Sequence, residues 1–235
     1  MYTIAQDMCG GFKTFIDEQK NVPGDLRVSL YQFDDQYEVV YENRSIKDID
    51  GLTLVPRNNT ALLDAVGRAI NDTGRRLAEM PEHQRPHKVI FMVITDGQEN
   101  ASREYTRERI KSMIQHQESK YGWTFVFLGA NQNAFHEGHA MGFQSGNTMN
   151  FAANARGTTE VYKSFSGKMS AVRTHSPEAV QLCSGNFYNQ MDYDAQTTAG
   201  AQNNPTQSSD DTTSSASPAT NSSTAATWTK TPDNK

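Results

Sequence analysis

Cysteine, aromatic residues, long apolar runs and excess positive charge are all scarce in this chain. Only Cys9 and Cys183 are cysteines among 235 residues, too few for a disulfide framework or a thiolate zinc cage. No stretch approaches the ~18 consecutive apolar residues that a membrane helix needs. Lysine and arginine total 22 against 27 acidic residues, without the basic stripe of a nucleic-acid-binding protein. The start of the chain also lacks the pattern of a secretory signal. We therefore expect a soluble, cytoplasmic protein with no nucleic-acid or membrane partner.

The common catalytic motifs are missing as well. There is no GxGxxG or GxxxxGK[ST] phosphate loop and no GxSxG nucleophile elbow. The paired acids Asp34 and Asp35 fall in an expected hairpin turn, where Asp commonly bonds to nearby backbone. We predict that the chain is not an enzyme. The alternative is a metal-assisted hydrolase or nucleotide-binding α/β protein that uses Asp96 and Glu99.

Hydrophobic periodicity is present from residue 1 to about residue 194, and it alternates between helix and strand. Two continuous apolar runs, 88–97 and 123–131, are typical of strands buried on both faces of a parallel sheet. The pattern predicts helices at 2–20, 61–80, 102–117, 132–141 and 158–172, and further strands at 26–33, 37–43 and 148–151. Such alternation indicates an α/β fold with a mostly parallel sheet and helices on both faces. Gly10 and Gly11 are expected to allow the first helix to pack closely on that sheet.

The composition changes at residue 195. Residues 195–235 contain 10 Thr, 7 Ser and a single aromatic residue, Trp228, with no apolar periodicity. Such a segment cannot bury enough surface to offset its ordering entropy. We predict a domain at 1–194 and a disordered Ser/Thr-rich tail at 195–235, acting as a spacer or as a partner-docking tail. Deleting the residues after Asp194 is expected to leave the thermal midpoint nearly unchanged.

Polar residues at two strand ends predict where a ligand binds. In parallel α/β sheets, ligands bind at the carboxyl ends of the strands. Here Asp96 and Glu99 follow one buried strand, and Asn131 follows the next. Asn59 and Thr60 form a second loop, directly before the helix at 61–80. We predict that Asn59, Glu99 and Asn131 contact a partner.

Four segments, in this order, resemble the von Willebrand factor A domain, most closely the intracellular kind of bacteria and phages. They are LRVSLYQFDD, NNTALLDAVG, VIFMVITDGQENAS and WTFVFLGANQNAF, and the resemblance covers residues 1–173. It implies a doubly wound sheet that carries a metal-ion-dependent adhesion site. Carried over by motif, Thr60 and Asp96 would be metal ligands for Mg²⁺, since hydroxyl and carboxylate oxygens suit a hard cation. The alternatives are a helix N-cap for Thr60 and a plain turn residue for Asp96.

The chain departs from this family at its start. The first, central strand and its D-x-S-x-S loop are missing, Met1 stands where the family's loop methionine would be, and Asn58 replaces a usual Gly. The position of Met1 suggests that the chain begins at an internal codon or that the gene is truncated. We expect Mg²⁺ binding to be weak or absent. The lost strand would cost ~7–15 kcal/mol of burial, as much as the ~5–15 kcal/mol net stability of a domain. The chain should therefore fold poorly unless another segment or a partner fills the gap.

These patterns favour a protein-interaction module with an incomplete adhesion site, which binds a protein ligand through an acidic residue. A phage structural component whose tail is the working part is a further alternative.

Overall fold

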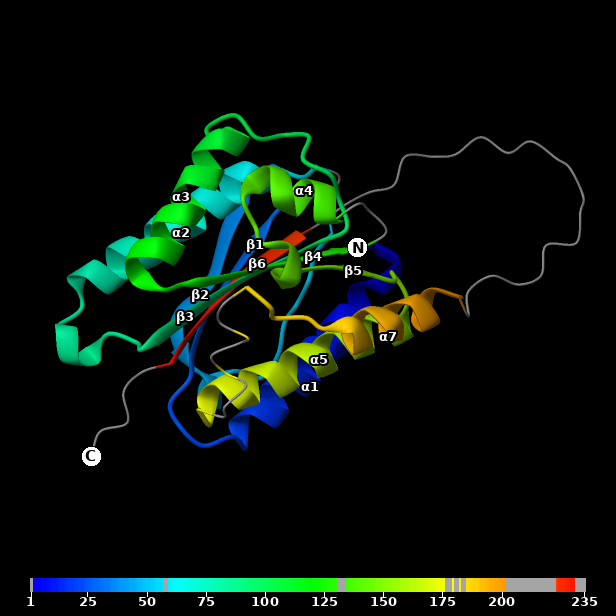
Figure 1. The fold of residues 1–235 in the computed structure, drawn as a ribbon, viewed down its shortest axis with the longest axis horizontal. Coiled ribbons are helices and arrows are strands. Elements are labelled where there is room, and N and C mark those ends of the chain that lie inside the picture. Colours follow the sequence, from blue (N-terminus) through cyan, green and yellow to red (C-terminus); the bar gives the residue numbers. More distant parts are fainter. Residues whose placement is uncertain are drawn as a thin grey trace, which may run out of the picture.

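The computed structural model describes residues 2–56, 59–130, 134–175, 179, 182, 185–201 and 223–230 (Figure 1). The helices are α1 (Ala5–Lys20), α2 (Leu62–Glu79), α3 (Arg107–Tyr121), α4 (Ala134–Met141), α5 (Ala155–Arg173) and α7 (Gln190–Ala201). The strands are β1 (Arg27–Phe33), β2 (Tyr37–Ser45), β3 (Lys88–Thr95), β4 (Thr124–Ala130), β5 (Thr148–Phe151) and β6 (Ser223–Lys230). Short 3-10 turns lie at Tyr2–Ile4, Ile46–Asp48, Glu82–Gln84 and Ser145–Asn147. Every element expected up to residue 173 is present, so the prediction of a mixed α/β protein is confirmed.

The six strands form one sheet in the order β2-β1-β6-β3-β4-β5. β3, β4 and β5 pair in parallel, whereas β6 is antiparallel to both β1 and β3. It follows that β1, β3, β4 and β5 all point the same way, and that β2 and β6 run against them. The carboxyl ends of the four co-directional strands therefore share one edge of the sheet.

Helices cover both faces of the sheet because its inner strands are apolar on both sides. Alternate residues of β3 belong to different cores: Ile90 and Met92 to one, and Phe91 and Val93 to the other. The first core includes residues of α1 and α5, and the second includes residues of α2, α3 and α4. Figure 1 shows these two groups of helices on opposite sides of the strands. No helix of the described segments combines the length and the apolarity needed to cross a membrane.

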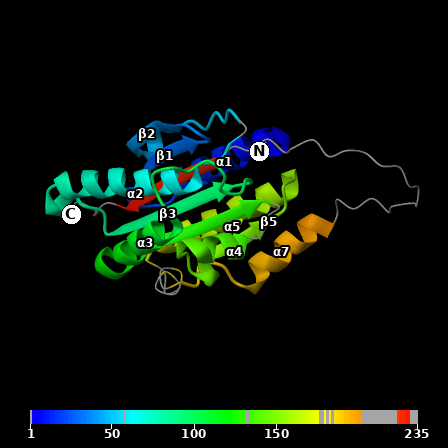
Figure 2. The ribbon, with the colours of Figure 1, turned by 90° about the horizontal axis from the view of Figure 1, so that it is seen from above.

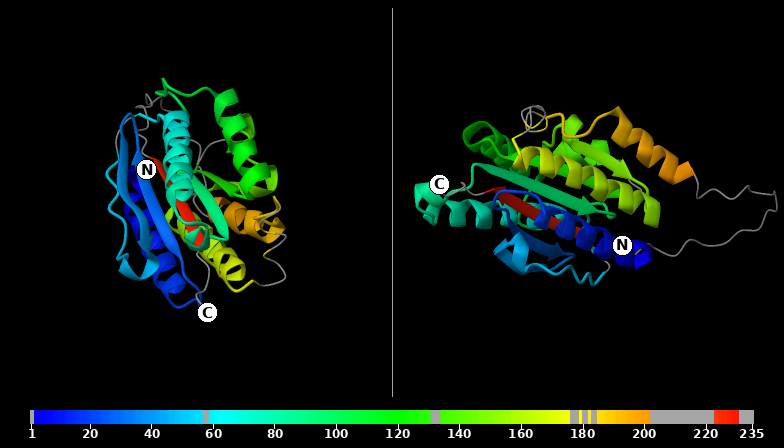
Figure 3. Two further views of the ribbon diagram at one scale, coloured as in Figure 1. Left: turned by 90° about the vertical axis from the view of Figure 1, so that its left-hand side faces the viewer. Right: turned by 90° about the horizontal axis from the view of Figure 1, so that it is seen from below.

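The centre of the sheet is filled by a segment that the sequence assigned to a structureless tail. β6 lies between β1 and β3, as Figures 2 and 3 show for the red strand between its two neighbours. Residues 195–201 are also ordered, as the second half of α7. The expectation of a disordered tail therefore does not hold for residues 195–201 and 223–230. Residues 202–222 and 231–235, the rest of that tail, lie outside the described part of the chain.

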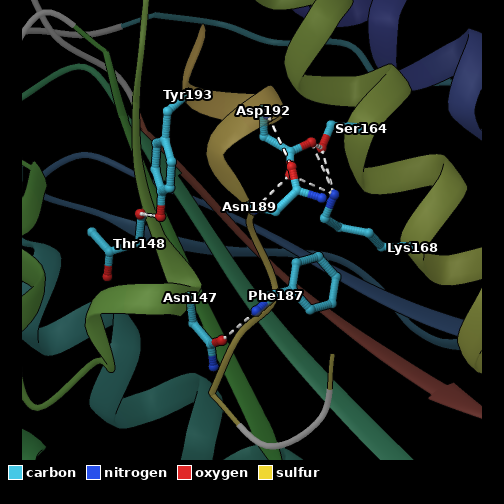
Figure 4. Close-up of polar contacts among 8 residues, drawn as sticks. All are labelled: Asn147, Thr148, Ser164, Lys168, Phe187, Asn189, Asp192 and Tyr193. Atoms are coloured by element: carbon cyan, nitrogen blue, oxygen red, sulfur yellow. Dashed lines mark hydrogen bonds and ion pairs between the residues drawn. The ribbon is translucent and has the colours of Figure 1, made fainter. Parts of the chain in front are cut away.

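A polar cluster fastens α7 to α5 and to the edge strand β5 (Figure 4). The Lys168 ammonium donates to both carboxylate oxygens of Asp192, at 2.9 and 2.8 Å, and the Ser164 hydroxyl donates to the same carboxylate at 2.5 Å. The Tyr193 hydroxyl donates to the carbonyl of Thr148, the first residue of β5, at 3.1 Å. The Tyr193 bond, together with the Gln196 side-chain oxygen that accepts from the Ala152 amide just after β5, holds α7 beside this edge strand.

Candidate functional site

Two acidic residues flank the beginning of β6 at the shared carboxyl edge. Phe33 ends β1 and Thr95 ends β3, and both pair with Ser223, the first residue of β6. Asp34 and Asp96 come next in the chain, so one acidic residue follows each of the two strands that flank β6. The two strands lie two spacings apart, about 10 Å. The tertiary fold thus brings together acids that are 62 residues apart in sequence.

The loop before α2 is tied to both of these strand ends. The Ala61 amide donates to the Asp34 carbonyl at 2.6 Å. The Thr60 amide donates to the Asn100 side-chain oxygen at 2.9 Å, and the Asn100 amide donates back to the Thr60 carbonyl at 3.1 Å. Thr60 therefore sits where the loops after β1 and β3 meet the start of α2.

The Thr60 side chain is fully buried, and its hydroxyl has no hydrogen-bond partner among the described residues. The helix-cap explanation fails, because the cap residue of α2 is Ala61 and the Thr60 hydroxyl accepts no amide of the helix. A buried hydroxyl without a partner costs about 1–3 kcal/mol. Thr124 has the same feature, but it begins β4 and so lies at the opposite edge of the sheet. Thr73 and Thr158 also have such hydroxyls. The loop of Thr60 differs in being hydrogen-bonded to the loops that carry Asp34 and Asp96.

Asp96 follows β3 in a tight local turn. The Thr95 hydroxyl donates to the Gly97 carbonyl at 3.0 Å and accepts from the Gly97 amide at 3.1 Å. This pair of bonds fixes the backbone on either side of Asp96, which is half-buried. Asp34 is buried in the hairpin turn, and its carboxylate accepts from the Gln36 amide at 2.6 Å. The expectation of local backbone bonding by Asp34 is confirmed.

Glu99 serves the protein's own loops. One oxygen of its carboxylate accepts from the Leu63 amide at 2.9 Å and from the Ser102 hydroxyl at 2.7 Å. Its other oxygen accepts from the amides of Ala101 at 3.0 Å and Ser102 at 2.8 Å. Glu99 therefore satisfies an unpaired amide at the start of α2, a structural role that the sequence did not reveal.

Asp64 is a second structural acid, and the sequence reasoning missed it. Its buried carboxylate accepts three backbone amides of the β3–α3 loop, from Arg103, Glu104 and Tyr105, at 2.8–2.9 Å. An acid in the first helical turn is an ordinary helix-dipole feature, and it gives no sign of a loop partner about 40 residues away. Together, Asp64 and Glu99 hold this loop against α2.

A polar cavity of about 530 Å³ opens beside these loops. Asn59 and Asp35 line it, and the Asn59 amide donates to the Asp35 carboxylate at 3.2 Å. Arg68 and Glu104 line it too, and Glu104 accepts two bonds from the Arg68 guanidinium, at 3.0 and 2.5 Å. Neither Thr60 nor Asp96 is among the lining residues, so the cavity adjoins the carboxyl edge without including those two groups.

The structure brings some of the predicted site residues together and not others. Thr60, Asp96 and Glu99 lie on loops that contact one another, and Asn59 lies exposed at the adjoining cavity. Asn131 lies outside the described residues. Across the described segments, no group of three or more His, Cys, Asp or Glu is arranged to hold a metal ion. The Thr60 hydroxyl nevertheless suits a hard cation, because its buried oxygen has no hydrogen-bond partner among the described residues.

Comparison with known proteins adds no relative: no protein-family model, no curated protein and no solved structure matches the chain.

Proposed function

We propose that the chain is a protein-interaction module of the von Willebrand factor A type. In this proposal the sheet is doubly wound, and Thr60 and Asp96 supply an incomplete Mg²⁺ site to which a partner's carboxylate adds a ligand. The unsatisfied buried hydroxyl of Thr60 at the carboxyl edge is the observation that carries it.

The strand order supports the location of this site. From β1 the chain continues outward to β2 on one side, and from β3 it continues outward to β4 and β5 on the other. The direction of winding therefore changes between β1 and β3. In open α/β sheets, ligands bind outside the carboxyl ends of the strands at this point of reversal. Asp34, Asp96 and Thr60 all belong to the loops at that point.

The donor set explains the proposed mode of binding. A Mg²⁺ ion held by one hydroxyl and one carboxylate would keep several waters and most of its positive charge. Such an ion supplies an attachment point for an acidic side chain of a partner. The neighbouring cavity, with Asn59, Asp35 and Arg68, would hold polar groups around that side chain.

The enzyme alternative has less support. It assigns chemistry to Asp96 and Glu99, but both oxygens of Glu99 already accept hydrogen bonds from the loop and from α2. A general base must reach a substrate proton directly or through one water. The contacts of Glu99 favour a structural role instead.

A titration of the full chain with Mn²⁺, a paramagnetic substitute for Mg²⁺, tests the proposal. We expect weak binding that needs millimolar metal, since so few protein ligands are present. Thr60→Val and Asp96→Asn should both abolish the response. Without metal, Thr60→Val should raise the free energy of unfolding by about 1 kcal/mol, because it removes an unsatisfied buried hydroxyl.

Thr124→Val is the matched control, since it removes a similar hydroxyl at the other edge of the sheet. It should raise stability in the same way and leave metal binding intact. The adhesion-site mechanism is wrong if Thr60→Val and Asp96→Asn bind Mn²⁺ as the unmodified chain does.

A further inference from the structure

The central strand of the sheet is also its last described segment. Every residue of β1 from Arg27 to Phe33, and every residue of β3 from Lys88 to Thr95, has a partner in β6. Among the strands described, β6 alone connects the β2–β1 pair to the β3–β4–β5 group. If β6 leaves, the facing backbone groups of β1 and β3 become two unpaired edges, which are templates for any other strand.

The sequence of β6 is unusual for this position. It reads Ser-Thr-Ala-Ala-Thr-Trp-Thr-Lys, with one large apolar residue, whereas β3 reads Lys-Val-Ile-Phe-Met-Val-Ile-Thr. The hydrogen bonds that the structure describes for β6 are its two backbone ladders, with β1 and with β3. Another copy of the same segment can make those bonds equally well.

The connection to β6 is long. Residues 202–222 separate the end of α7 from the start of β6, whereas most connections within a domain have about 4–6 residues. These 21 residues span up to ~70 Å when extended, which is enough to reach a neighbouring molecule. Lengthening a loop adds little to its closure cost, so a tether of this length permits intramolecular pairing without enforcing it.

We propose that the slot between β1 and β3 is a strand-exchange interface, and that its second occupant is residues 223–230 of another copy of this chain. Two chains then form a reciprocal, two-fold symmetric dimer in which each β6 completes the sheet of the other. The exchanged strand makes the same backbone pairs as in the monomer. Protein concentration, set against the ~mM effective concentration typical of two binding segments joined in one chain, therefore decides between monomer and dimer. This inference is independent of the metal site.

Cysteine crosslinking between full-length chains tests the exchange. In a Cys9→Ala, Cys183→Ala background, one chain carries Ser29→Cys and the other carries Thr227→Cys, two positions that the β1–β6 register places opposite each other. Opposite residues have Cβ atoms ~4.5–5.5 Å apart, close to what a disulfide needs. After oxidation of the mixed chains, we expect a disulfide-linked heterodimer whose yield rises with concentration.

Two controls make the result decisive. A single chain with both Ser29→Cys and Thr227→Cys should close within itself, which proves the register. Arg27→Cys, mixed with the Thr227→Cys chain, should give little product because Arg27 pairs with Thr229 instead. Equal yields with Arg27→Cys and Ser29→Cys would assign the crosslinks to random collision and overturn the proposal. So would intrachain closure of the double variant without any heterodimer from the mixture.

A competing peptide tests whether the slot between β1 and β3 takes a second copy of this chain or a foreign strand. A synthetic peptide of residues 223–230, in excess, should reduce the heterodimer yield. If an unrelated strand-forming peptide reduces the yield and the peptide of residues 223–230 does not, the slot prefers a foreign strand and the proposal falls.

A shortened connection provides a test without cysteines. Because α7 runs along β5, its end is at least three strand spacings, about 14 Å, from β6. A variant that keeps two of residues 202–222 reaches only about 10 Å. It can complete a sheet only by exchange, so light scattering should show a dimer where the full chain at the same low concentration is monomeric. A folded, monomeric short variant would refute the proposal, and the crosslinking decides if this variant does not fold.

Discussion

Asp64 and Glu99 show how single carboxylates organise the carboxyl edge of this sheet. Each accepts at least three hydrogen bonds from backbone amides or a hydroxyl. Bonds to a charged acceptor contribute about 1.5–3 kcal/mol each, roughly twice as much as neutral ones. These two acids therefore fix the loop between β3 and α3, against which the proposed ligands Thr60 and Asp96 lie.

Asp192 is the residue for which the structure predicts a pH dependence. Burial by itself raises the pKa of this carboxyl, but the Asn189 amide, the Lys168 ammonium and the Ser164 hydroxyl outweigh burial and lower it below its usual value. A pKa lowered in the folded state gives stability that is full above the unfolded pKa of about 3.9 and is lost as pH falls through the folded pKa.

Replacing this carboxylate should therefore destabilise the protein more at neutral pH than at acidic pH. Asp192→Asn leaves the Lys168 ammonium, whose side chain is 12% exposed, without its counter-ion. We expect a loss of about 2 kcal/mol at pH 7, or ~4–8 °C in the thermal midpoint, and a smaller loss at pH 3, which lies below the unfolded pKa. Thermal melts at both pH values measure this. Asp17→Asn breaks an exposed ion pair with Lys13 and is the control, with a nearly unchanged midpoint at pH 7. An equal penalty for Asp192→Asn at both pH values would show that shape, and not charge, matters there.

At the scale of elements, α1 packs closely on a neighbour at a glycine, as the sequence predicted, but that neighbour is a helix and not the sheet. Gly10 and Gly11 were expected to allow close packing on the sheet. A Cβ at Gly11 would instead collide with the ring of Tyr162 on α5, and a Cβ at Gly10 would meet nothing. Close approach is therefore needed between two helices on the same face of the sheet, and only one of the two glycines is required for it.

These adjacent positions give a matched pair of substitutions. Gly11→Ala should destabilise by about 1–3 kcal/mol because it forces the Tyr162 ring out of its packed position. Gly10→Ala should stabilise by about 0.5–1 kcal/mol, since alanine favours a helix interior and the space is open. Urea unfolding of both variants measures the two changes. A shift of the same sign in both would mean that α1 does not pack on α5 in this way.

For the whole molecule, the decisive element is β6. The sequence expectation was that deleting everything after Asp194 would change little. The structure reverses that expectation, because such a deletion removes the central strand and the second half of α7. Residues 223–230 lie between β1 and β3, where the sequence indicated no strand.

Two truncations distinguish the contribution of β6 to stability from that of the residues after it. A chain that ends at residue 222 loses the hydrogen bonds of two strand ladders, several kcal/mol in total, against a net stability of about 5–15 kcal/mol. Circular dichroism should show a large fall in its urea midpoint or loss of cooperative unfolding. A chain that ends at residue 230 should unfold like the full chain. If both truncations unfold alike, β6 contributes little and the sheet is stable in two parts.

The sequence by itself determined the mixed α/β class and the positions of α1–α5 and β1–β5. Their apolar residues recur with helical or strand spacing, and burial of those residues is the main driving force of folding. It also indicated Thr60 and Asp96 as residues of one polar edge. It did not indicate β6, because Ser, Thr and Ala carry no apolar pattern and strand preference depends strongly on neighbouring strands. Nor did it indicate the roles of Asp64 and Glu99, whose partners on facing loops are distant in sequence. Only the tertiary structure decided these features, since the unpaired edges of β1 and β3 that accept β6 exist only after the two halves of the sheet have formed.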